Sequence, residues 1–153
     1  MKTERPWTWK NFPLEKQCAD ALGMEFRVDI FSAALRHDPE NVDLLLEVGN
    51  LYTRLGCFQE GLAIDERLVR IRPHEAAFHY NLACSHALLE EVEHSFRALK
   101  RAIELGYDNY EYIQLDSDLD NLRRDPRYGD FFADLARRIA GSKGSAVEQK
   151  PQE

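Results

Sequence analysis

The 153-residue sequence has few cysteines and no long apolar run. Its three cysteines, Cys18, Cys57 and Cys84, cannot all pair with one another, and their spacing fits no zinc or redox motif. We therefore expect reduced thiols, as in a cytoplasmic protein. No stretch approaches the ~18 consecutive apolar residues of a membrane-spanning helix. Residues 1–13 also lack the apolar core of a secretory signal, so the sequence predicts neither a membrane span nor export.

The sequence also lacks an excess of basic residues. It has 20 Lys and Arg against 27 Asp and Glu, a formal net charge of −7. This balance argues against non-specific nucleic-acid binding, which needs a basic face. Between Ala102 and Leu122 there is no Lys or Arg. The acids there are either helix caps and solvated surface, or a negative rim that favours basic partners: Glu104, Asp108, Glu111, Asp116, Asp118 and Asp120.

Catalytic motifs are missing as well. There is no phosphate-binding loop, no serine nucleophile elbow and no pair of carboxylates in a plausible cleft. His79 and His86 lie seven residues apart and would share a helix face, but no third ligand is spaced to complete a metal site. We predict that the protein is not an enzyme and holds no cofactor or metal. A hydrolase or metal protein built on these two histidines is the alternative from another functional class.

What the sequence does contain is a repeat of 34 residues between Val42 and Leu105. Residues of similar size or polarity recur at that spacing, which is typical of stacked helical repeats. Small residues recur at two positions, where we expect two helices to cross closely, with Gly61 opposite Gly49. The matched pairs are Val48 and Leu82, Gly49 and Ala83, Phe58 and Val92, Gly61 and Ser95, Leu68 and Ala102, and Ile71 and Leu105.

These residues resemble the tetratricopeptide (TPR) repeat. The first copy carries Leu45, Val48-Gly49, Tyr52, Gly61, Leu68 and Pro73, and the second carries His79, Leu82-Ala83, His86, Ser95, Leu99 and Ala102. A preceding half unit carries Phe31, Ala34, Leu35, His37 and Pro39. The resemblance covers roughly residues 24–107. It implies an all-α fold, an antiparallel helix-pair solenoid, whose concave groove holds a segment of another protein.

The pattern predicts specific helices and boundaries. We expect one domain over residues 1–140, with a half unit at 14–39, full units at 42–73 and 76–107, a cap at 108–140 and a disordered tail at 141–153. The half unit should have a short first helix before its second one, and Trp7 and Trp9 should cover an end of the array. The expected helices are Leu14–Leu22, Glu25–His37, Val42–Leu55, Phe58–Ile71, Glu75–Leu89 and Val92–Leu105.

The stretch from Leu115 to Tyr128 resembles the segment that closes many bacterial TPR proteins. Asp116 or Ser117 should cap a short helix, and Asp125 should cap another that begins at Pro126. An amphipathic last helix should follow, with its apolar side formed by Phe131, Phe132, Leu135 and Ile139. This resemblance implies a bacterial source.

In TPR arrays the first helix of each pair lines the groove. The resemblance therefore assigns these groove residues: Asp43, Leu46, Glu47, Asn50, Arg54, Ala77, Tyr80, Asn81, Cys84 and Leu88. Asn50 and Asn81 match the two asparagines of the TPR domains that clamp a C-terminal carboxylate. The basic residues of that clamp are absent, because Leu46, Glu111 and Leu115 stand in their places. We expect the two asparagines to share one concave surface and to bond the backbone of an extended peptide.

The sequence thus predicts a non-catalytic protein- or peptide-binding module in a bacterial cytoplasm. It should be a monomer or weak dimer, bind a protein or peptide, and bind neither nucleic acid nor a membrane. The alternative within the same fold is a small TPR-type chaperone of a bacterial secretion or assembly system, which would hold an unstructured client segment in the same groove.

Overall fold

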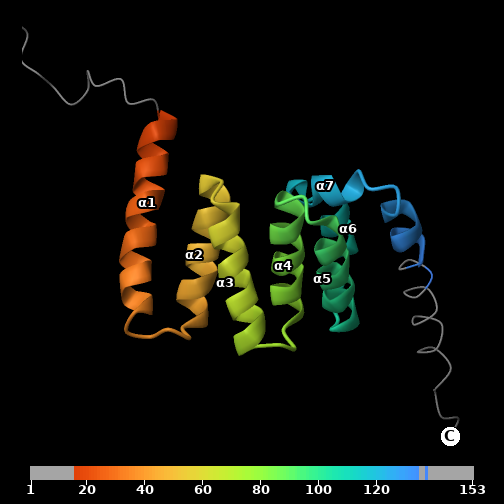
Figure 1. Cartoon of the computed structure of the whole chain (residues 1–153), viewed down its shortest axis with the longest axis horizontal. Coiled ribbons are helices and arrows are strands. Elements are labelled where there is room, and N and C mark those ends of the chain that lie inside the picture. Colours follow the sequence, from red (N-terminus) through yellow and green to blue (C-terminus); the bar gives the residue numbers. More distant parts are fainter. Residues whose placement is uncertain (1–15, 135–136, 138–153) are drawn as a thin grey trace, which may run out of the picture. The chain divides into compact units, whose positions relative to one another are not determined.

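The computed structural model describes residues 16–134 and residue 137, with side chains from Asp20 onward (Figure 1). Within these residues all regular structure is helical, which confirms the all-α class. Trp7, Trp9, Leu135, Ile139 and the tail 141–153 lie outside the described residues. Residues 128–134 are helical, and the other elements are α1 (Lys16–Leu35), α2 (Val42–Leu55), α3 (Phe58–Ile71), α4 (Ala76–Leu88), α5 (Val92–Glu104), α6 (Tyr110–Leu115), the 3-10 helix η2 (Ser117–Leu119) and α7 (Asp120–Arg123).

The chain divides into two compact units, residues 1–71 and 72–153. The division falls directly after the second helix of the first predicted copy, two residues before the predicted end of that copy at residue 73. The first unit contains α1, α2 and α3, and the second contains α4, α5 and the closing segment 108–134. Each unit therefore contains one complete helix pair.

Helices α2 and α3 begin and end at the predicted residues because the local signals are strong. The Asn41 side chain accepts a hydrogen bond from the Leu44 amide at 3.1 Å and so caps α2. Gly56 ends α2 with φ 75°, a left-handed conformation that glycine adopts without the steric cost of a Cβ. In α3, Arg67 donates a hydrogen bond to the Pro39 carbonyl oxygen, which ties this helix to the turn before α2.

Helix α1 differs from the prediction. It is one continuous helix from Lys16 to Leu35, where the sequence predicted a break between Leu22 and Glu25. The physical reason lies at Gly23, which stays in the helical region and does not take the left-handed conformation seen at Gly56. With no proline or left-handed residue there, nothing ends the helix. The short first helix of the half unit is therefore absent from the described residues.

The predicted close crossing at Gly49 is present in the first unit. A Cβ placed on Gly49 would lie 3.2 Å from Cγ2 of Ile64, closer than a side chain normally approaches. Gly61 lies opposite, since a Cβ placed there would be 4.0 Å from the Gly49 carbonyl oxygen. The two glycines allow α2 and α3 to pack with their backbones close together.

The second unit repeats this crossing with slightly larger residues. The Ser95 hydroxyl, which is fully buried, donates a hydrogen bond to the carbonyl oxygen of Ala83 at 2.8 Å. Ser95 and Ala83 are the residues that the 34-residue alignment matches to Gly61 and Gly49. The same two positions are therefore the contact between the paired helices in both units.

The turn after the first helix of the pair is repeated as well. Glu90 lies 34 residues after Gly56 and has φ 61°, the one left-handed residue other than glycine in the described chain. A side chain in this conformation costs roughly 1–2 kcal/mol per residue. The fold thus keeps the geometry of the glycine turn at a position where the sequence offers no glycine.

We expect Glu90→Gly to stabilise the protein by about 1 kcal/mol, because it removes the left-handed strain. Urea unfolding followed by circular dichroism measures the change. Lys100→Gly is the matched control, since Lys100 is exposed inside α5, and it should destabilise by about 1 kcal/mol. A Glu90→Gly variant that loses stability as Lys100→Gly does would contradict the assigned turn.

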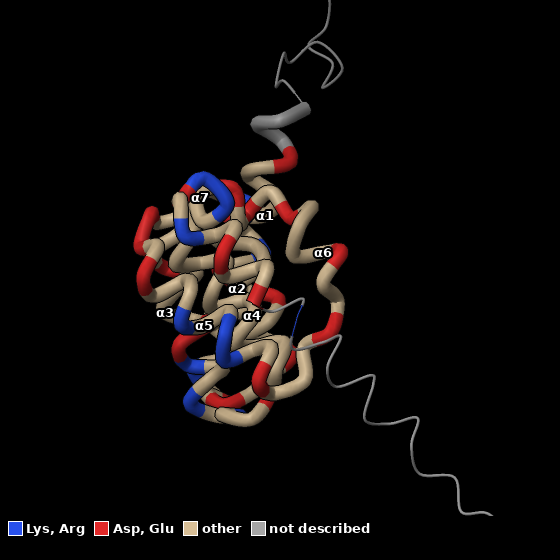
Figure 2. Tube along the Cα trace, turned by 90° about the vertical axis from the view of Figure 1, so that its right-hand side faces the viewer, with Lys and Arg blue, Asp and Glu red and all other residues tan. Residues whose placement is uncertain are grey.

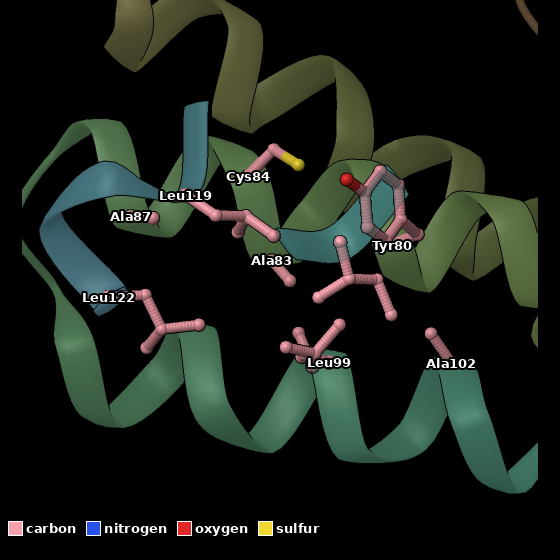
Figure 3. Close-up of a cluster of buried hydrophobic side chains, with 10 residues drawn as sticks. Tyr80, Ala83, Cys84, Ala87, Leu99, Ala102, Leu119 and Leu122 are labelled. Carbon is pink, nitrogen blue, oxygen red and sulfur yellow. The ribbon is translucent and has the colours of Figure 1, made fainter. Parts of the chain in front are cut away.

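The closing segment completes the core of the second unit (Figure 3). Ile113, Leu119 and Leu122 are fully buried and pack with Leu99 of α5 and Ala87 of α4. Asp116 caps η2 as predicted, because its side chain accepts a hydrogen bond from the Asp118 amide at 3.0 Å. The Asp125 side chain accepts one from the Arg127 amide at 2.9 Å, but the helix that follows begins at Tyr128 and not at the predicted Pro126.

Two arginines hold the closing segment in place. Arg123 donates hydrogen bonds to the carbonyl oxygens of Ile113 at 3.0 Å and Asp116 at 2.5 Å. Arg127 bonds both carboxylate oxygens of Asp125, at 2.8 and 3.0 Å, and pairs with Glu93 of α5 at 2.6 Å. Arg123 and Arg127 therefore fix the closing segment through their bonds to backbone and carboxylate groups.

Candidate functional site

The first candidate surface is the polar side of α2. Buried Leu45 and Val48 occupy the opposite side of the helix, so residues spaced three or four apart along the polar side face solvent. Leu46 is half-buried, and the other predicted groove residues of this helix are exposed: Asp43, Glu47, Asn50 and Arg54. This surface offers carboxylate, amide and guanidinium groups to a partner.

One residue of this surface already has a partner within the unit. Glu47 pairs with Arg27 of α1 at 2.9 Å, and the Arg27 guanidinium lies 5.6 Å from the centre of the Phe31 ring. Glu47 is therefore less available than Asn50 to a bound peptide. Asn50 remains the residue of α2 whose amide can both donate to and accept from a peptide backbone.

The predicted groove residues of α4 divide into two groups. Ala77 is exposed, while Asn81 and Leu88 are half-buried. Tyr80 and Cys84 are buried, with 5% and 8% of their surface exposed, and so present little surface to a partner. In Figure 3 the oxygen of Tyr80 and the sulfur of Cys84 lie on the side of α4 away from Leu99.

The carboxylate of Asp116, at the start of η2, explains this burial in part. It accepts a hydrogen bond from the Tyr80 hydroxyl at 2.6 Å, and the Cys84 thiol lies 3.8 Å from the same oxygen. The Tyr80 ring stacks on that of Tyr107, with centroids 4.4 Å apart and planes 4° from parallel. Tyr80 and Cys84 therefore act as links between α4 and the closing segment.

The tyrosines of this cluster do not serve as bases near neutral pH. Burial raises the pKa of Tyr80 far above its ordinary value, and the bond to Asp116 adds to the effect. Burial also raises the pKa of Tyr107 to about 12. Both phenols keep their protons, so the cluster donates hydrogen bonds and contributes aromatic surface.

The outer side of the closing segment is apolar and acidic. Tyr112 and Leu115 of α6 are 49% and 74% exposed. Glu111 is exposed as well, and Figure 2 shows α6 with acidic and neutral residues and no basic one. The acidic stretch predicted from the sequence thus reaches the surface at α6.

Asp118 is the acidic residue of this stretch whose ionisation is disfavoured by burial and by neighbouring acids. Burial raises the pKa of its carboxyl above the ordinary value, and the charges of Asp116 and Asp120 raise it further. Ionised Asp118 therefore opposes folding.

We expect Asp118→Asn to stabilise the protein at neutral pH and to change little near pH 3. Because the pKa of Asp118 is raised in the folded protein, protonated Asp118 favours the folded state. This contribution to stability is present below the ordinary pKa of about 3.9 and is lost as the pH rises. Thermal melting at both pH values tests this, with exposed Asp130→Asn as the control. An equal gain at both pH values would contradict the assigned electrostatic cause.

The two predicted helix-face histidines are used for packing. His79 and His86 are 9% and 8% exposed. The Nε2 of His79 lies 2.9 Å from the Pro73 carbonyl oxygen, and the Nδ1 of His86 lies 2.7 Å from a carboxylate oxygen of Glu91. Among the described residues no group of three or more His, Cys, Asp or Glu could hold a metal ion.

The helices of the described residues were also compared with the length and apolar character of a membrane span. None of them is long and apolar enough to cross a membrane.

Comparison with known proteins gives one limited similarity. No model of a protein family matches the chain. Over 82 residues the chain is 32% identical to a protein of Arabidopsis thaliana whose name describes it as chloroplastic. The matched region is 52% of this chain and 24% of that protein, so the chain spans about a quarter of the relative's length.

Proposed function

We propose that the protein is a non-catalytic binding module of the tetratricopeptide type, which holds an extended segment of a partner protein. The observation that carries this proposal is the repeated helix crossing, Gly49 with Gly61 in one pair and Ala83 with Ser95 in the other. Stacked repeat units of this kind form concave surfaces that bind partner proteins.

In each unit the proposed contact with the partner is made by the first helix of the pair, α2 in the first unit and α4 in the second. On α2 the contact residue is Asn50, which is exposed and has charged neighbours of both signs. On α4 it is Asn81, because Tyr80 and Cys84 are buried beside Asp116. Two asparagine amides bond a peptide backbone without selecting a side chain, so specificity comes from the neighbouring residues.

Two compartments are candidates for this activity. The closing segment of residues 115–128, with its resemblance to bacterial TPR proteins, favours a bacterial cytoplasm. The similarity to a protein named as chloroplastic favours a chloroplast. Fractionation of the native host, followed by immunoblotting, distinguishes the two.

We expect the double variant Asn50→Ala, Asn81→Ala to bind the partner at least about tenfold more weakly, because each amide loses its backbone bonds. The partner is first captured from the native host with the wild-type chain and identified by mass spectrometry. Its affinity for both chains is then measured by calorimetry. The melting temperature should change little, since Asn50 is exposed and Asn81 is only half-buried.

The matched control is Gln59→Ala, Gln114→Ala, which removes two exposed amides from α3 and α6. This control should keep wild-type affinity. Equal affinities of the two double variants for the partner would remove the asparagines from the binding surface and reject the proposed site.

A further inference from the structure

Helix α1 exposes three large apolar side chains in one line. Leu22, Phe26 and Ile30 are 61%, 64% and 48% exposed, and their spacing of four residues places them on one side of the helix. We name these three residues the α1 stripe. The opposite side of α1 carries buried Val28 and Leu35.

A helix that is apolar on two opposite sides is normally covered on both. Helix α1 packs against α2 within its unit. The 34-residue alignment indicates that the repeat does not need apolar residues at all the positions of the α1 stripe. Phe26 aligns with Glu60 of α3, which is exposed and charged. Leu22 lies before Met24, the residue aligned with the start of α3, so only Ile30 has an apolar counterpart, Ile64.

We propose that the α1 stripe is a docking site for an amphipathic helix of a partner protein, with basic residues beside the apolar side of that helix. The charges around the stripe define this partner. Asp20, Glu25 and Asp29 are exposed on α1 beside the stripe. Arg27 is paired with Glu47 at 2.9 Å, so its charge is compensated within the unit. The stripe therefore has an acidic border that complements lysine or arginine.

The geometry of the stripe fits a helix. From Leu22 to Ile30 it extends about 12 Å along α1, at 1.5 Å per residue. A partner helix covers such a line with apolar residues spaced three and four apart. This surface is separate from the polar side of α2 that carries Asn50, so docking there is an interaction beyond the proposed function.

A second copy of the chain fits the stripe less well. A stable protein dimer uses about 20–30 residues from each side, whereas the stripe supplies three. Two stripes packed together would also bring Glu25 and Asp29 of both copies near one another, and like charges at an interface disfavour association.

Two synthetic peptides test the proposal against the full chain. Both are amphipathic helices with leucines on one side, and the flanking residues are lysines in one and glutamates in the other. Fluorescence anisotropy should show at least about tenfold tighter binding of the lysine peptide. Phe26→Glu should weaken that binding by at least about tenfold, while Leu115→Glu, an exposed site on α6, should leave it unchanged.

Phe26→Glu should keep the wild-type melting curve, because Phe26 is exposed and aligned Glu60 is tolerated in α3. If that variant fails to fold, Leu22→Glu takes its place, since Leu22 is equally exposed. Equal binding of the two peptides, no binding of the lysine peptide, or a Phe26→Glu variant with unchanged affinity would overturn the proposal.

Two further outcomes assign the stripe to another occupant and also overturn the proposal. Self-association in sedimentation that disappears in Phe26→Glu would assign it to a second copy. Lysine-peptide binding that emerges only after Trp7 and Trp9 are both replaced by alanine would assign it to residues 1–15 of the chain itself.

Discussion

Replacing Leu122 with alanine is expected to lower the free energy of unfolding by about 2–5 kcal/mol. Leu122 belongs to α7 and has no exposed surface. It packs in the core of the second unit with Ala87 and Leu99. Truncation removes apolar contacts and leaves a cavity that the surrounding helices fill only in part, so the loss should be among the largest for a single substitution in this chain.

Urea unfolding followed by circular dichroism measures this loss. Leu115→Ala is the matched control, because Leu115 is 74% exposed, and it should change stability by less than about 0.5 kcal/mol. Similar losses for the two variants would mean that the closing segment does not complete the core.

The second large effect is expected at Gly49. Gly49→Leu should destabilise the protein by roughly 1–3 kcal/mol, because the added side chain must displace Ile64 or separate α2 from α3. Even the first added atom would lie 3.2 Å from Ile64 Cγ2 and 3.9 Å from a carboxylate oxygen of Asp65. Asp65 is buried, so its position is constrained as well.

Gly23→Leu is the matched control for this prediction. Gly23 is also helical, and a Cβ placed there meets nothing within 4 Å. Leucine forms helices better than glycine by roughly 0.8 kcal/mol, so this control should be neutral or mildly stabilising. Thermal melting distinguishes the two. A Gly49→Leu variant as stable as Gly23→Leu would reject the close crossing.

The sequence was sufficient to predict α2 and α3 because each boundary has a local physical signal. Asn41 caps the start of α2, Gly56 ends it, and Pro73 follows α3. The 34-residue period predicted the second pair. Helix α4 is one residue shorter than predicted at each end, and α5 is one residue shorter at its C-terminal end. Small residues at fixed spacing also predicted the crossing, since a close backbone approach excludes larger side chains.

Other features had weaker signals. Gly23 suggested a break in α1, but glycine ends a helix only where the chain takes a left-handed conformation, and that depends on the surroundings. At Glu90 the turn geometry is imposed by the fold against local preference. The burial of Tyr80 and Cys84 arises in part from Asp116, which lies outside the repeat and which no periodic pattern could connect to α4.

The most direct test of the repeated packing is a proton NMR measurement of the full chain. We expect cross-relaxation between the Gly49 α protons and the Ile64 γ2 methyl group. We also expect a contact in the second pair between the Ser95 side chain and Ala83, the residues that align with Gly61 and Gly49. Observing both contacts would support one packing unit used twice. Absence of the Ser95–Ala83 contact in a folded sample that shows the Gly49–Ile64 contact would contradict it.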